Sequence, residues 1–193
     1  MDDIVVKSKT KSGLIADLTE TFSNLRRYNM RLNPEKCVFG VPAGKLLGFI
    51  VSQRGIEANP DKIKAIEALK KPENLKDVQR LTGCVAALSR FISRLGEKAL
   101  PLYRLLKKSD KFVWDDEADA ALQDLKRTLA VAPILAAPLE HEPLLLYIAT
   151  TNKVVSAVIV IEHKEEGKEH QVQRPVYYIS ECLTESKQPY SHY

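Results

Sequence analysis

The chain has 193 residues, of which 45% are hydrophobic and 28% are charged. This composition is too apolar for a disordered tail, and its charges are too evenly spread for a membrane protein. The longest apolar runs, Leu144–Ala149 and Val154–Ile161, have the length of strands and are far shorter than the ~18 residues of a membrane-spanning helix. At ~100–200 residues per domain, the length fits one domain or two small ones.

The positive charge is concentrated in one part of the chain. Residues 59–111 contain 13 Lys and Arg against 6 Asp and Glu, a net charge of +7, whereas the remaining residues contain 16 against 19. A local excess of this kind fits a surface that faces a polyanion, and it fits equally a solvated helical face.

The three cysteines, Cys37, Cys84 and Cys182, are far apart in the sequence and odd in number. None of them lies at zinc-site spacing from another Cys or a His, so a zinc knuckle is not expected. The odd count argues against a disulfide framework and fits a reducing compartment. Because no basic-then-apolar leader precedes Ile4, we expect a protein of the cytoplasm or the nucleus that is not secreted.

The N-terminal part of the chain predicts one strand and one helix. Ile4–Val6 indicates a short strand. Apolar residues then recur at helical spacing from Leu14 to Leu25. This helix ends before Pro34, because proline disfavours helical geometry in the residue that precedes it.

A hairpin is predicted next. Val38-Phe39 and Leu46–Val51 indicate two short strands, and Pro42–Lys45 between them has the composition of a turn. Gln53–Gly55 marks a further turn.

Residues 59–111 predict a compact unit of three helices. Asn59, followed by a proline, is typical of a helix start, and Pro72 closes this first helix. Asn74 caps a second helix, whose apolar positions continue to Ile92. Leu100, Tyr103 and Leu106 indicate the third helix.

The remaining residues predict one helix and three strands. Acidic residues at positions 115–117 open an amphipathic helix that carries Leu122, Leu125 and Leu129. The strands are expected at 144–149, 154–161 and 176–179, with a polar loop at 163–174 and the start of another helix at 184–193.

Two adjacent carboxylates, Asp2 and Asp3, precede the first predicted strand. Neighbouring carboxylates can hold Mg²⁺, and two such ions can clamp the attacking and leaving oxygens of a phosphoryl transfer. An Asp-Asp pair alone is also typical of an exposed turn.

A series of short segments carries a resemblance to a known family. The series comprises Met1–Val6, Leu32–Cys37, Leu47–Ser52, Gly55-Ile56, Asn59–Ile63, Asp77–Gly83, Arg90–Ile92, Phe112–Asp115 and Arg174–Ser180. In this order and spacing it resembles the reverse transcriptase of gypsy-type LTR retrotransposons, particularly those of plants. The resemblance covers essentially the whole chain.

The resemblance implies an α+β fold in three parts. Residues 1–58 correspond to the C-terminal part of the reverse transcriptase palm, with its hairpins. Residues 59–111 correspond to a three-helix thumb. Residues 112–193 correspond to the connection and the N-terminal part of an RNase H-like domain, with an incomplete mixed α/β sheet.

The resemblance also implies site residues in the palm. Asp2 and Asp3 match the acids of the family's Tyr-x-Asp-Asp motif, which bind catalytic Mg²⁺, whereas the family's third metal-binding Asp and its fingers precede the part that this chain matches. Leu47-Gly48-Phe49 matches the hairpin that positions the primer end. Lys36 lies in a motif near the incoming deoxynucleoside triphosphate, and an exposed lysine without that role is an equal alternative.

In the thumb, the family holds the RNA or DNA template–primer by its backbone, without reading sequence. Ordinary surface residues are expected among the candidates as well. The candidate nucleic-acid-binding cations are Lys70, Lys71, Lys76, Arg80, Arg90, Arg94, Lys107 and Lys108.

In the RNase H-like part, alignment on Val155–Ile159 places the family's first-strand metal-binding Asp at Ala149, which cannot bind a metal. This position is therefore expected to be degenerate, as in lineages in which the domain is a connecting tether. Nearby acids are expected to be solvated loop charges and not replacement ligands; these are Glu140, Glu142, Glu162, Glu165 and Glu166.

The sequence therefore predicts a fragment of a retrotransposon RNA-directed DNA polymerase with an RNase H-like region. We expect the isolated chain to be catalytically incomplete but to retain elements that bind template–primer, so that deoxynucleoside triphosphates and Mg²⁺ concern the complete enzyme. No membrane contact is expected, and a virus-like particle or the nucleus fits the resemblance. The alternatives are a non-catalytic nucleic-acid-binding protein and a decayed retroelement remnant.

Overall fold

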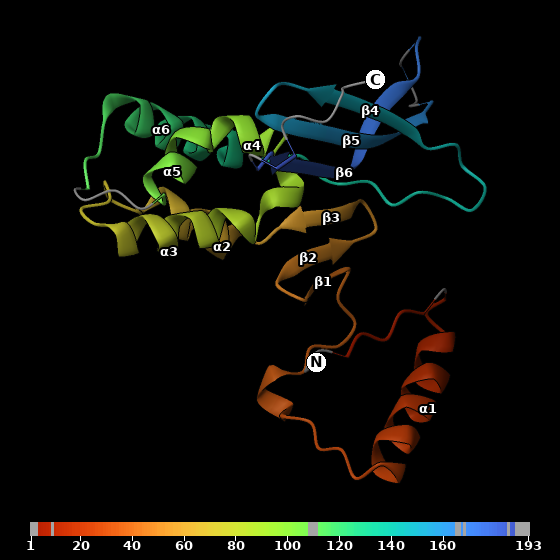
Figure 1. Cartoon of the computed structure of the whole chain (residues 1–193). Helices are drawn as coiled ribbons and strands as arrows, with labels where there is room; N and C mark the ends of the chain where they lie inside the picture. The colour runs from red at the N-terminus through yellow and green to blue at the C-terminus, as the bar shows by residue number, and fades with distance from the viewer. Residues whose placement is uncertain are drawn as a thin grey trace. The chain divides into compact units, whose positions relative to one another are not determined.

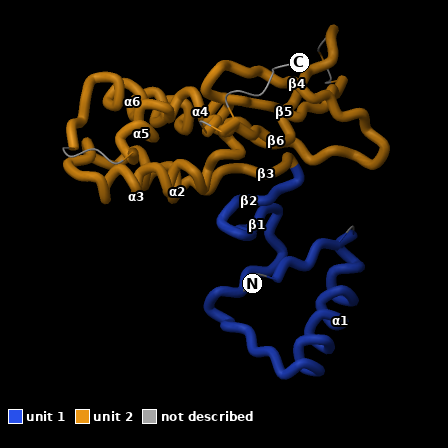
Figure 2. The backbone as a smooth tube through the Cα atoms, in the orientation of Figure 1, with its two compact units in different colours: residues 1–53 blue, residues 54–193 orange. Residues whose placement is uncertain are grey.

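The chain forms two compact units in a computed structural model (Figures 1 and 2). The structure describes residues 4–8, 10–107, 112–164, 167, 169–184 and 186–187. Unit 1 comprises residues 1–53 and unit 2 comprises residues 54–193. The predicted α+β class is confirmed.

The described residues of unit 1 contain one long helix, one 3₁₀ turn and a hairpin. These elements are α1 (Gly13–Arg27), the 3₁₀ turn η1 (Pro34–Lys36), β1 (Ala43–Leu46) and β2 (Phe49–Ser52). The predicted helix is confirmed, and Phe22 on it meets the ring of Phe39 edge-on at 6.4 Å between centroids. The strands expected at residues 4–6 and 38–39 are wrong, because both stretches are irregular.

The hairpin of unit 1 turns at a different place from the one predicted. Residues 43–46, which were expected to lie in or next to the turn, form β1, which pairs antiparallel with β2 so that Leu46 faces Phe49. The turn consists of Leu47 and Gly48, with φ values of 50° and 77°. Two successive positive φ values are the geometry of the two-residue turns that match the twist of a hairpin. Gly48 is therefore a turn residue, although it was expected within the strand Leu46–Val51.

Unit 2 begins with a short strand, β3 (Gly55–Ala58), and a set of helices. The helices are α2 (Pro60–Glu67), α3 (Leu75–Ala86), the 3₁₀ turn η2 (Ser89–Phe91), α4 (Leu95–Lys98), α5 (Leu100–Leu105) and α6 (Asp116–Ala130). We call α2 to α5, with the loops between them, the helical module. The three helices expected there are found as α2, α3 and α5, and α4 is an additional short helix.

Three predicted helix starts are confirmed. At each of them, a side chain accepts a hydrogen bond from a main-chain N–H group in the first turn of the helix. The side-chain oxygens of Asn59, Asn74 and Asp115 accept hydrogen bonds from main-chain N–H groups two or three residues later, at 2.9, 3.1 and 2.8 Å. Such caps satisfy N–H groups that the first turn of a helix leaves unpaired.

The second helix of the module is shorter than predicted. It ends at Ala86, although its apolar pattern continues to Ile92. A 3₁₀ turn follows, and Arg94 adopts a left-handed conformation with φ of 54°. This change of direction allows Phe91, Ile92 and Leu95 all to be at most 5% exposed.

A three-stranded antiparallel sheet completes unit 2. It consists of β4 (Leu145–Thr150), β5 (Val154–His163) and β6 (Val172–Cys182), in the order β4-β5-β6. The three predicted strands are confirmed, and all their pairings within the described residues are antiparallel. A register shift at Ile159/Val160 accommodates Pro175, which cannot donate a ladder hydrogen bond.

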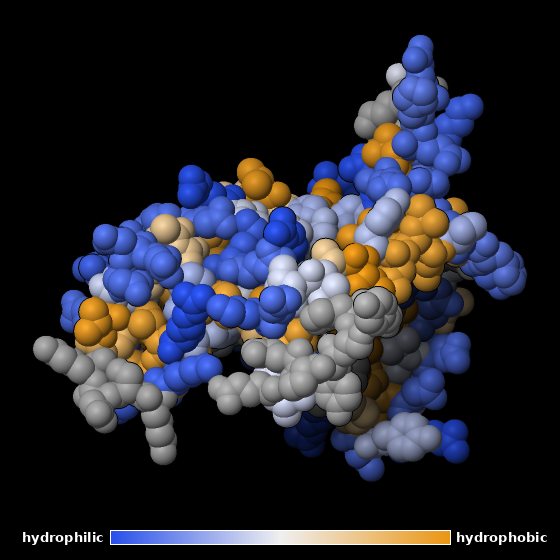
Figure 3. Space-filling view, turned by 45° about the horizontal axis from the view of Figure 1, so that its top comes forward, coloured by the Kyte–Doolittle hydropathy of each residue, from blue (hydrophilic) through white to orange (hydrophobic). Residues whose placement is uncertain are grey.

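One face of this sheet is apolar and uncovered in the part of the chain that the structure describes. Leu146, Ile148 and Ile179 are 59%, 64% and 60% exposed. Figure 3 shows hydrophobic residues gathered on the side of unit 2 where the strands lie.

The opposite face of the sheet meets α4 at a seam of small residues. The Gly96 N–H donates to Ser180 Oγ at 2.9 Å, and Cys182 Sγ lies 3.3 Å from the Gly96 carbonyl oxygen. A Cβ on Gly96 would lie 2.7 Å from Val154 Cγ1, so only glycine allows this approach. Burial raises the pKa values of the Cys182 thiol and the nearby Tyr103 hydroxyl, which are both kept neutral.

The strand β3 joins the helices to the sheet through a short extended segment. Ile56 and Leu135 exchange two main-chain hydrogen bonds of 2.8 and 2.9 Å, and the Ala136 N–H donates to the Pro175 carbonyl oxygen at 2.8 Å. Gly55, with φ of 132°, passes this segment so closely that a Cβ would lie 2.0 Å from the Leu135 carbonyl oxygen.

The core of unit 2 lies between the helical module and α6. The apolar residues that are at most 2% exposed there are Ile66, Val78, Leu81, Val85, Leu88, Phe91, Ile92, Ala99, Leu102, Ala118, Leu122, Leu125 and Leu129. Among the described helices, none has the length and apolar character needed to cross a membrane.

Candidate nucleic-acid interface

The candidate cations of the helical module fall into groups that the structure separates. Lys70, Lys71, Lys76 and Arg80 are exposed and lie around the connection from α2 to α3. None of these four side chains forms a hydrogen bond or ion pair with any residue that the structure describes. Lys108 lies outside the described residues.

A hollow of about 220 Å³ lies at this connection. Three cations contribute to it, together with two acidic and three apolar residues. The lining residues are Leu69, Lys70, Lys71, Pro72, Glu73, Asp77, Arg80 and Leu81. We call this feature the corner hollow.

Hydrogen bonds within the connection and from α6 hold the residues around the corner hollow. Asn74 caps α3, and the Asp77 carboxylate accepts the Glu73 N–H at 3.1 Å. Lys126 of α6 donates through Nζ to the carbonyl oxygens of Glu67 and Leu69, at 2.8 and 2.6 Å. Because these carbonyls lie at the end of α2, Lys126 offsets the negative end of that helix.

Three of the other candidates, Arg90, Arg94 and Lys107, have partners. The Arg90 guanidinium stacks over the Tyr177 ring of β6, 5.3 Å from its centroid. Arg94 bonds to Glu97, and this hydrogen bond raises the pKa of the Arg94 guanidinium. Lys107 is exposed just after α5 and is not free either.

Among the described residues, sequence reasoning missed one exposed cation of the helical module that has no partner. Lys64 is exposed on α2, and among the described residues its side chain has no partner. The sequence contained a signal for its exposure, because Ile63 and Ile66 indicate which face of this helix is buried. Lys98 and Arg104, which were not selected, pair with Asp124 and Glu117 of α6 at 2.6 and 3.3 Å.

The palm candidates lie in unit 1. Leu47 is 57% exposed at the tip of the hairpin, and Gly48 and Phe49 are half-buried. Lys36 is exposed at the end of η1, where the Asn33 side chain accepts the Glu35 N–H at 3.0 Å. Their expected contacts with a primer end and a triphosphate stay predictions.

The residues expected to bind Mg²⁺ in the family, Asp2 and Asp3, lie outside the described residues. Within the described part of the chain, no group of three or more His, Cys, Asp or Glu is placed to hold a metal ion. Ala149 is exposed on β4 opposite Ser156, which in turn lies 2.8 Å from Ser180 between their hydroxyl oxygens.

The acidic residues near Ala149 were expected to be solvated, and the structure agrees with this expectation only in part. Glu140 is 90% exposed, as expected for a solvated loop charge. Glu142 was expected to be solvated too, and this prediction is wrong because its side chain is only 12% exposed. Its Oε1 lies 3.3 Å from His163 Nε2, and its Oε2 accepts a hydrogen bond from the Leu139 N–H. Glu162 accepts a hydrogen bond from Gln173. Glu165 and Glu166 lie outside the described residues.

Two family models match separate parts of this chain. Residues 1–51 match the model described as reverse transcriptase (RNA-dependent DNA polymerase). Residues 114–193 match the model described as the RNase H-like domain found in reverse transcriptase.

Curated relatives match nearly the full chain. The Transposon Tf2-3 and Tf2-7 polyproteins of Schizosaccharomyces pombe are 27% and 26% identical to it over 191 residues, which is 99% of this chain. The chain spans 14% of the length of each of these polyproteins.

Solved structures share the fold. The structure of a foamy viral protease-reverse transcriptase in complex with dsDNA matches 96% of this chain and 38% of its own, with a TM-score of 0.76 and 20% identity. A structure of the foamy viral protein in complex with an RNA/DNA hybrid matches 96% of this chain and 24% of its own, with a TM-score of 0.77 and 19% identity.

Proposed function

We propose that this chain binds the backbone of a template–primer through its helical module and does not synthesise DNA by itself. The chain corresponds to part of the reverse transcriptase and RNase H-like region of a retroelement polyprotein. The observation that carries this proposal is the cluster of exposed, unpaired cations where α2 meets α3. The order of the sequence motifs supports a more specific assignment of this chain to the gypsy-type LTR elements of plants.

The nucleic-acid part of the proposal is supported by charge and by the solved relatives. Lys70, Lys71, Lys76 and Arg80 can each approach a phosphate without first breaking an ion pair within the described chain. Cations of this kind position a protein on a nucleic acid without reading its sequence. The foamy viral relatives are described with dsDNA and with an RNA/DNA hybrid, which are the two duplexes that we propose as ligands.

The expectation that this chain does not synthesise DNA by itself rests on the residues that would bind Mg²⁺. The reverse transcriptase and RNase H families generally use Mg²⁺, which stabilises the charge of the transferring phosphoryl group. Asp2 and Asp3 are the carboxylates that would hold it, and the resemblance implies that a third Asp is needed beside them. The match of 14% of a polyprotein's length supports the view that other parts of the parent complete the active site.

Binding is tested by fluorescence anisotropy with a DNA primer annealed to an RNA template. Backbone contacts release counterions, so the logarithm of the binding constant should fall linearly with the logarithm of salt concentration between roughly 50 and 200 mM. Salt-independent binding, or no binding at the lower concentration, would contradict the proposal.

Catalysis is tested by primer extension on a primed homopolymer with Mg²⁺ and deoxynucleoside triphosphates. We expect no extension above the background of an Asp2→Asn/Asp3→Asn variant. Robust incorporation that disappears in this variant would show that the chain is a complete polymerase.

The RNase H-like part is tested by incubation with an RNA/DNA hybrid and Mg²⁺. We expect no RNA cleavage, because the resemblance assigns Ala149 to the position of a metal-binding acid. The side chains paired with it across the sheet are the hydroxyls of Ser156 and Ser180. Cleavage of the RNA strand by the purified chain would overturn this expectation.

A further inference from the structure

We infer that this chain forms a two-fold symmetric dimer in which the open edge of β4 pairs antiparallel with β4 of a second copy. The inference goes beyond the proposed function and does not depend on it, because β4 belongs neither to the helical module nor to the corner hollow.

The strand β4 has an open edge. Within the described residues it pairs with β5 alone, since the strand order is β4-β5-β6 (Figure 1). About half of the main-chain N–H and C=O groups of such a strand point away from its sheet and can pair with a further strand. Leu145–Thr150 contains no charged residue, proline or glycine. Uncharged segments of this kind, with high strand propensity, are the ones that recruit another strand.

The other edge of the same sheet is protected. The strand β6 contains Arg174, Pro175 and Glu181, and its register against β5 is shifted. The Ala136 N–H also donates to the Pro175 carbonyl oxygen at 2.8 Å, so a neighbouring segment covers part of this edge. Charges, proline, irregular pairing and a covering segment all hinder strand addition. A pair of β4 strands therefore leaves only protected edges, and association closes at two copies.

The exposed side chains of β4 match a second copy of the strand. In a two-fold antiparallel pair centred on Tyr147, Leu146 of one copy lies opposite Ile148 of the other, and this contact occurs twice. Leu146 and Ile148 are 59% and 64% exposed, and as alternate residues of one strand they lie on the same face. Opposite residues of an antiparallel pair have Cβ atoms about 4.5–5.5 Å apart, so the pairing covers apolar surface that the single chain exposes.

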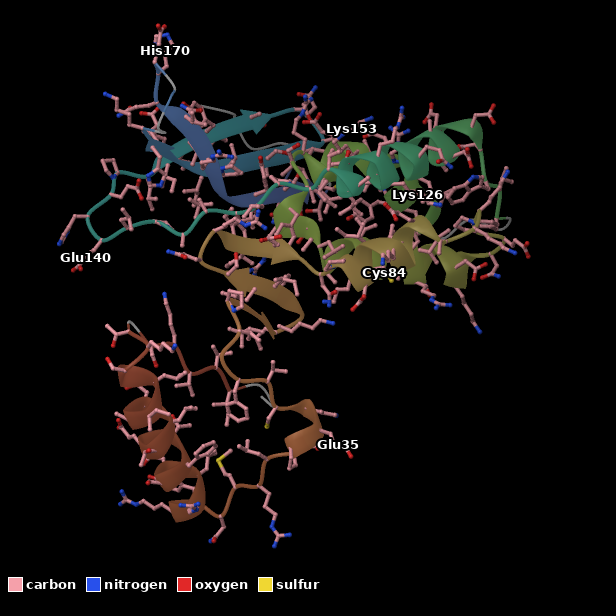
Figure 4. All side chains as sticks on the ribbon, turned by 180° about the vertical axis from the view of Figure 1, so that it is seen from behind. Glu35, Cys84, Lys126, Glu140, Lys153 and His170 are labelled. Carbon is pink, nitrogen blue, oxygen red and sulfur yellow. The ribbon has the colours of Figure 1, made fainter. Side chains whose placement is uncertain are left out.

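The charges at the two ends of β4 complement each other. Glu140 precedes the strand and is 90% exposed, whereas Lys153 follows it and has no side-chain partner among the described residues. Figure 4 shows these two residues at opposite ends of the sheet. An antiparallel pair places the start of one β4 beside the end of the other, so each Lys153 approaches the acidic end of the second copy. Such complementarity favours a second copy of this chain as the occupant of the edge.

Sedimentation equilibrium at a series of chain concentrations tests the inference. We expect a monomer–dimer equilibrium, with particles of twice the mass of one chain at high concentration. Leu146→Lys/Ile148→Lys should raise the dissociation constant of the dimer at least about tenfold, because two Lys–Lys pairs replace two apolar pairs. Leu146→Glu/Ile148→Glu should have the same effect. An equimolar mixture of the two variants should recover a dimer, because each lysine then lies opposite a glutamate.

Ile148→Lys and Ile179→Lys form a matched pair that separates the edge of the sheet from its apolar face. Ile179 is 60% exposed and lies in the same row across the sheet as Ile148, through Ala157, but it is on β6 and far from the open edge. Both substitutions add one charge to the apolar face. Only Ile148→Lys should weaken the dimer, and circular dichroism of each variant establishes that the fold is intact.

The possible results identify the edge, the face and the register. A chain that stays monomeric at every concentration, or that forms particles larger than a dimer, would overturn the inference. Equal weakening by Ile148→Lys and Ile179→Lys would show that two copies pack through the apolar face and not through the edge. If the lysine and glutamate variants do not recover a dimer on mixing, the antiparallel register centred on Tyr147 is wrong.

Discussion

Gly55 is a position at which the backbone of unit 2 leaves no room for a side chain. Its φ of 132° is strained for any other residue, and a Cβ would lie 2.0 Å from the Leu135 carbonyl oxygen, which is bonded to Ile56. We expect Gly55→Ala to lower the free energy of unfolding by about 3 kcal/mol, near the upper end of ordinary single substitutions. Urea denaturation followed by circular dichroism measures this change.

Gly83 provides a control of opposite sign. It lies exposed in α3, and a Cβ there would meet no atom within 4 Å. Gly83→Ala should therefore raise the free energy of unfolding by about 0.5–1 kcal/mol, because alanine loses less backbone entropy in a helix. Equal effects of the two substitutions would show that the close approach at Gly55 does not occur.

Cys182 is expected to react slowly with alkylating reagents. Burial raises the pKa of its thiol above the ordinary value of 9.0, so less of the reactive thiolate is present at pH 8. Mass spectrometry after iodoacetamide treatment should show slower labelling of Cys182 in the folded chain than in the same chain in urea. The difference should narrow as the pH rises through the raised pKa. Equal rates at pH 8 would contradict the buried seam.

At the scale of elements, the seam between α4 and the sheet depends on the absence of a side chain at Gly96. A Cβ would lie 2.7 Å from Val154 Cγ1 and 2.8 Å from Ser180 Oγ. We expect Gly96→Ala to destabilise unit 2 by about 2 kcal/mol, since one of the crowded atoms belongs to Val154, which is only 1% exposed. Thermal unfolding of this variant measures the loss.

A double-mutant cycle separates this clash from a general effect of the substitution. Val154→Ala alone should cost about 1–3 kcal/mol, because it leaves a cavity at a residue that is 1% exposed. In Gly96→Ala/Val154→Ala the loss should be smaller than the sum by at least about 0.5 kcal/mol, because the cavity accepts the new methyl group. An additive result would mean that Gly96 and Val154 are not in contact.

Elements defined by local bonds could be predicted from the sequence, and elements defined by distant partners could not. Asn59, Asn74 and Asp115 each bond to a main-chain N–H at most three residues away, so their helix starts are visible in the sequence. The hairpin turn falls on Leu47-Gly48, although Pro42–Lys45 has the stronger turn composition. Leu47 carries no signal for a positive φ, and only the pairing of β1 with β2 determines it.

The candidate interface was predictable to a similar extent. The concentration of positive charge and its exposure on helices are properties of the sequence pattern. Which cations remain unpaired depends on residues far along the chain, as for Arg90 with Tyr177 of β6 and Arg104 with Glu117 of α6. The Arg94–Glu97 pair is the exception, since it spans one turn and was visible in the sequence.

At the scale of the whole molecule, the two units differ in how much apolar surface they bury. Among the described residues of unit 1, Leu25 alone is buried, whereas large apolar residues such as Ile15, Val38 and Phe39 are 71%, 70% and 57% exposed. All the other buried hydrophobic residues of the described chain lie in unit 2. Because apolar burial is the main favourable term in folding, unit 1 should be much less stable by itself.

Hydrogen exchange measures this difference directly. Amide groups exchange through local opening, whose free energy is low where few apolar residues are buried. We expect the amides of α1 to exchange on the order of 100 times faster than those of α6, which corresponds to about 2.7 kcal/mol. The two helices are equal in length, with 15 residues each, so α6 is an internal control for helix length. Equal protection of α1 and α6 would show that unit 1 is stabilised by more than its own described residues. In the presence of template–primer, we expect slower exchange of the amides in the helical module, while the amides of α1 still exchange fast.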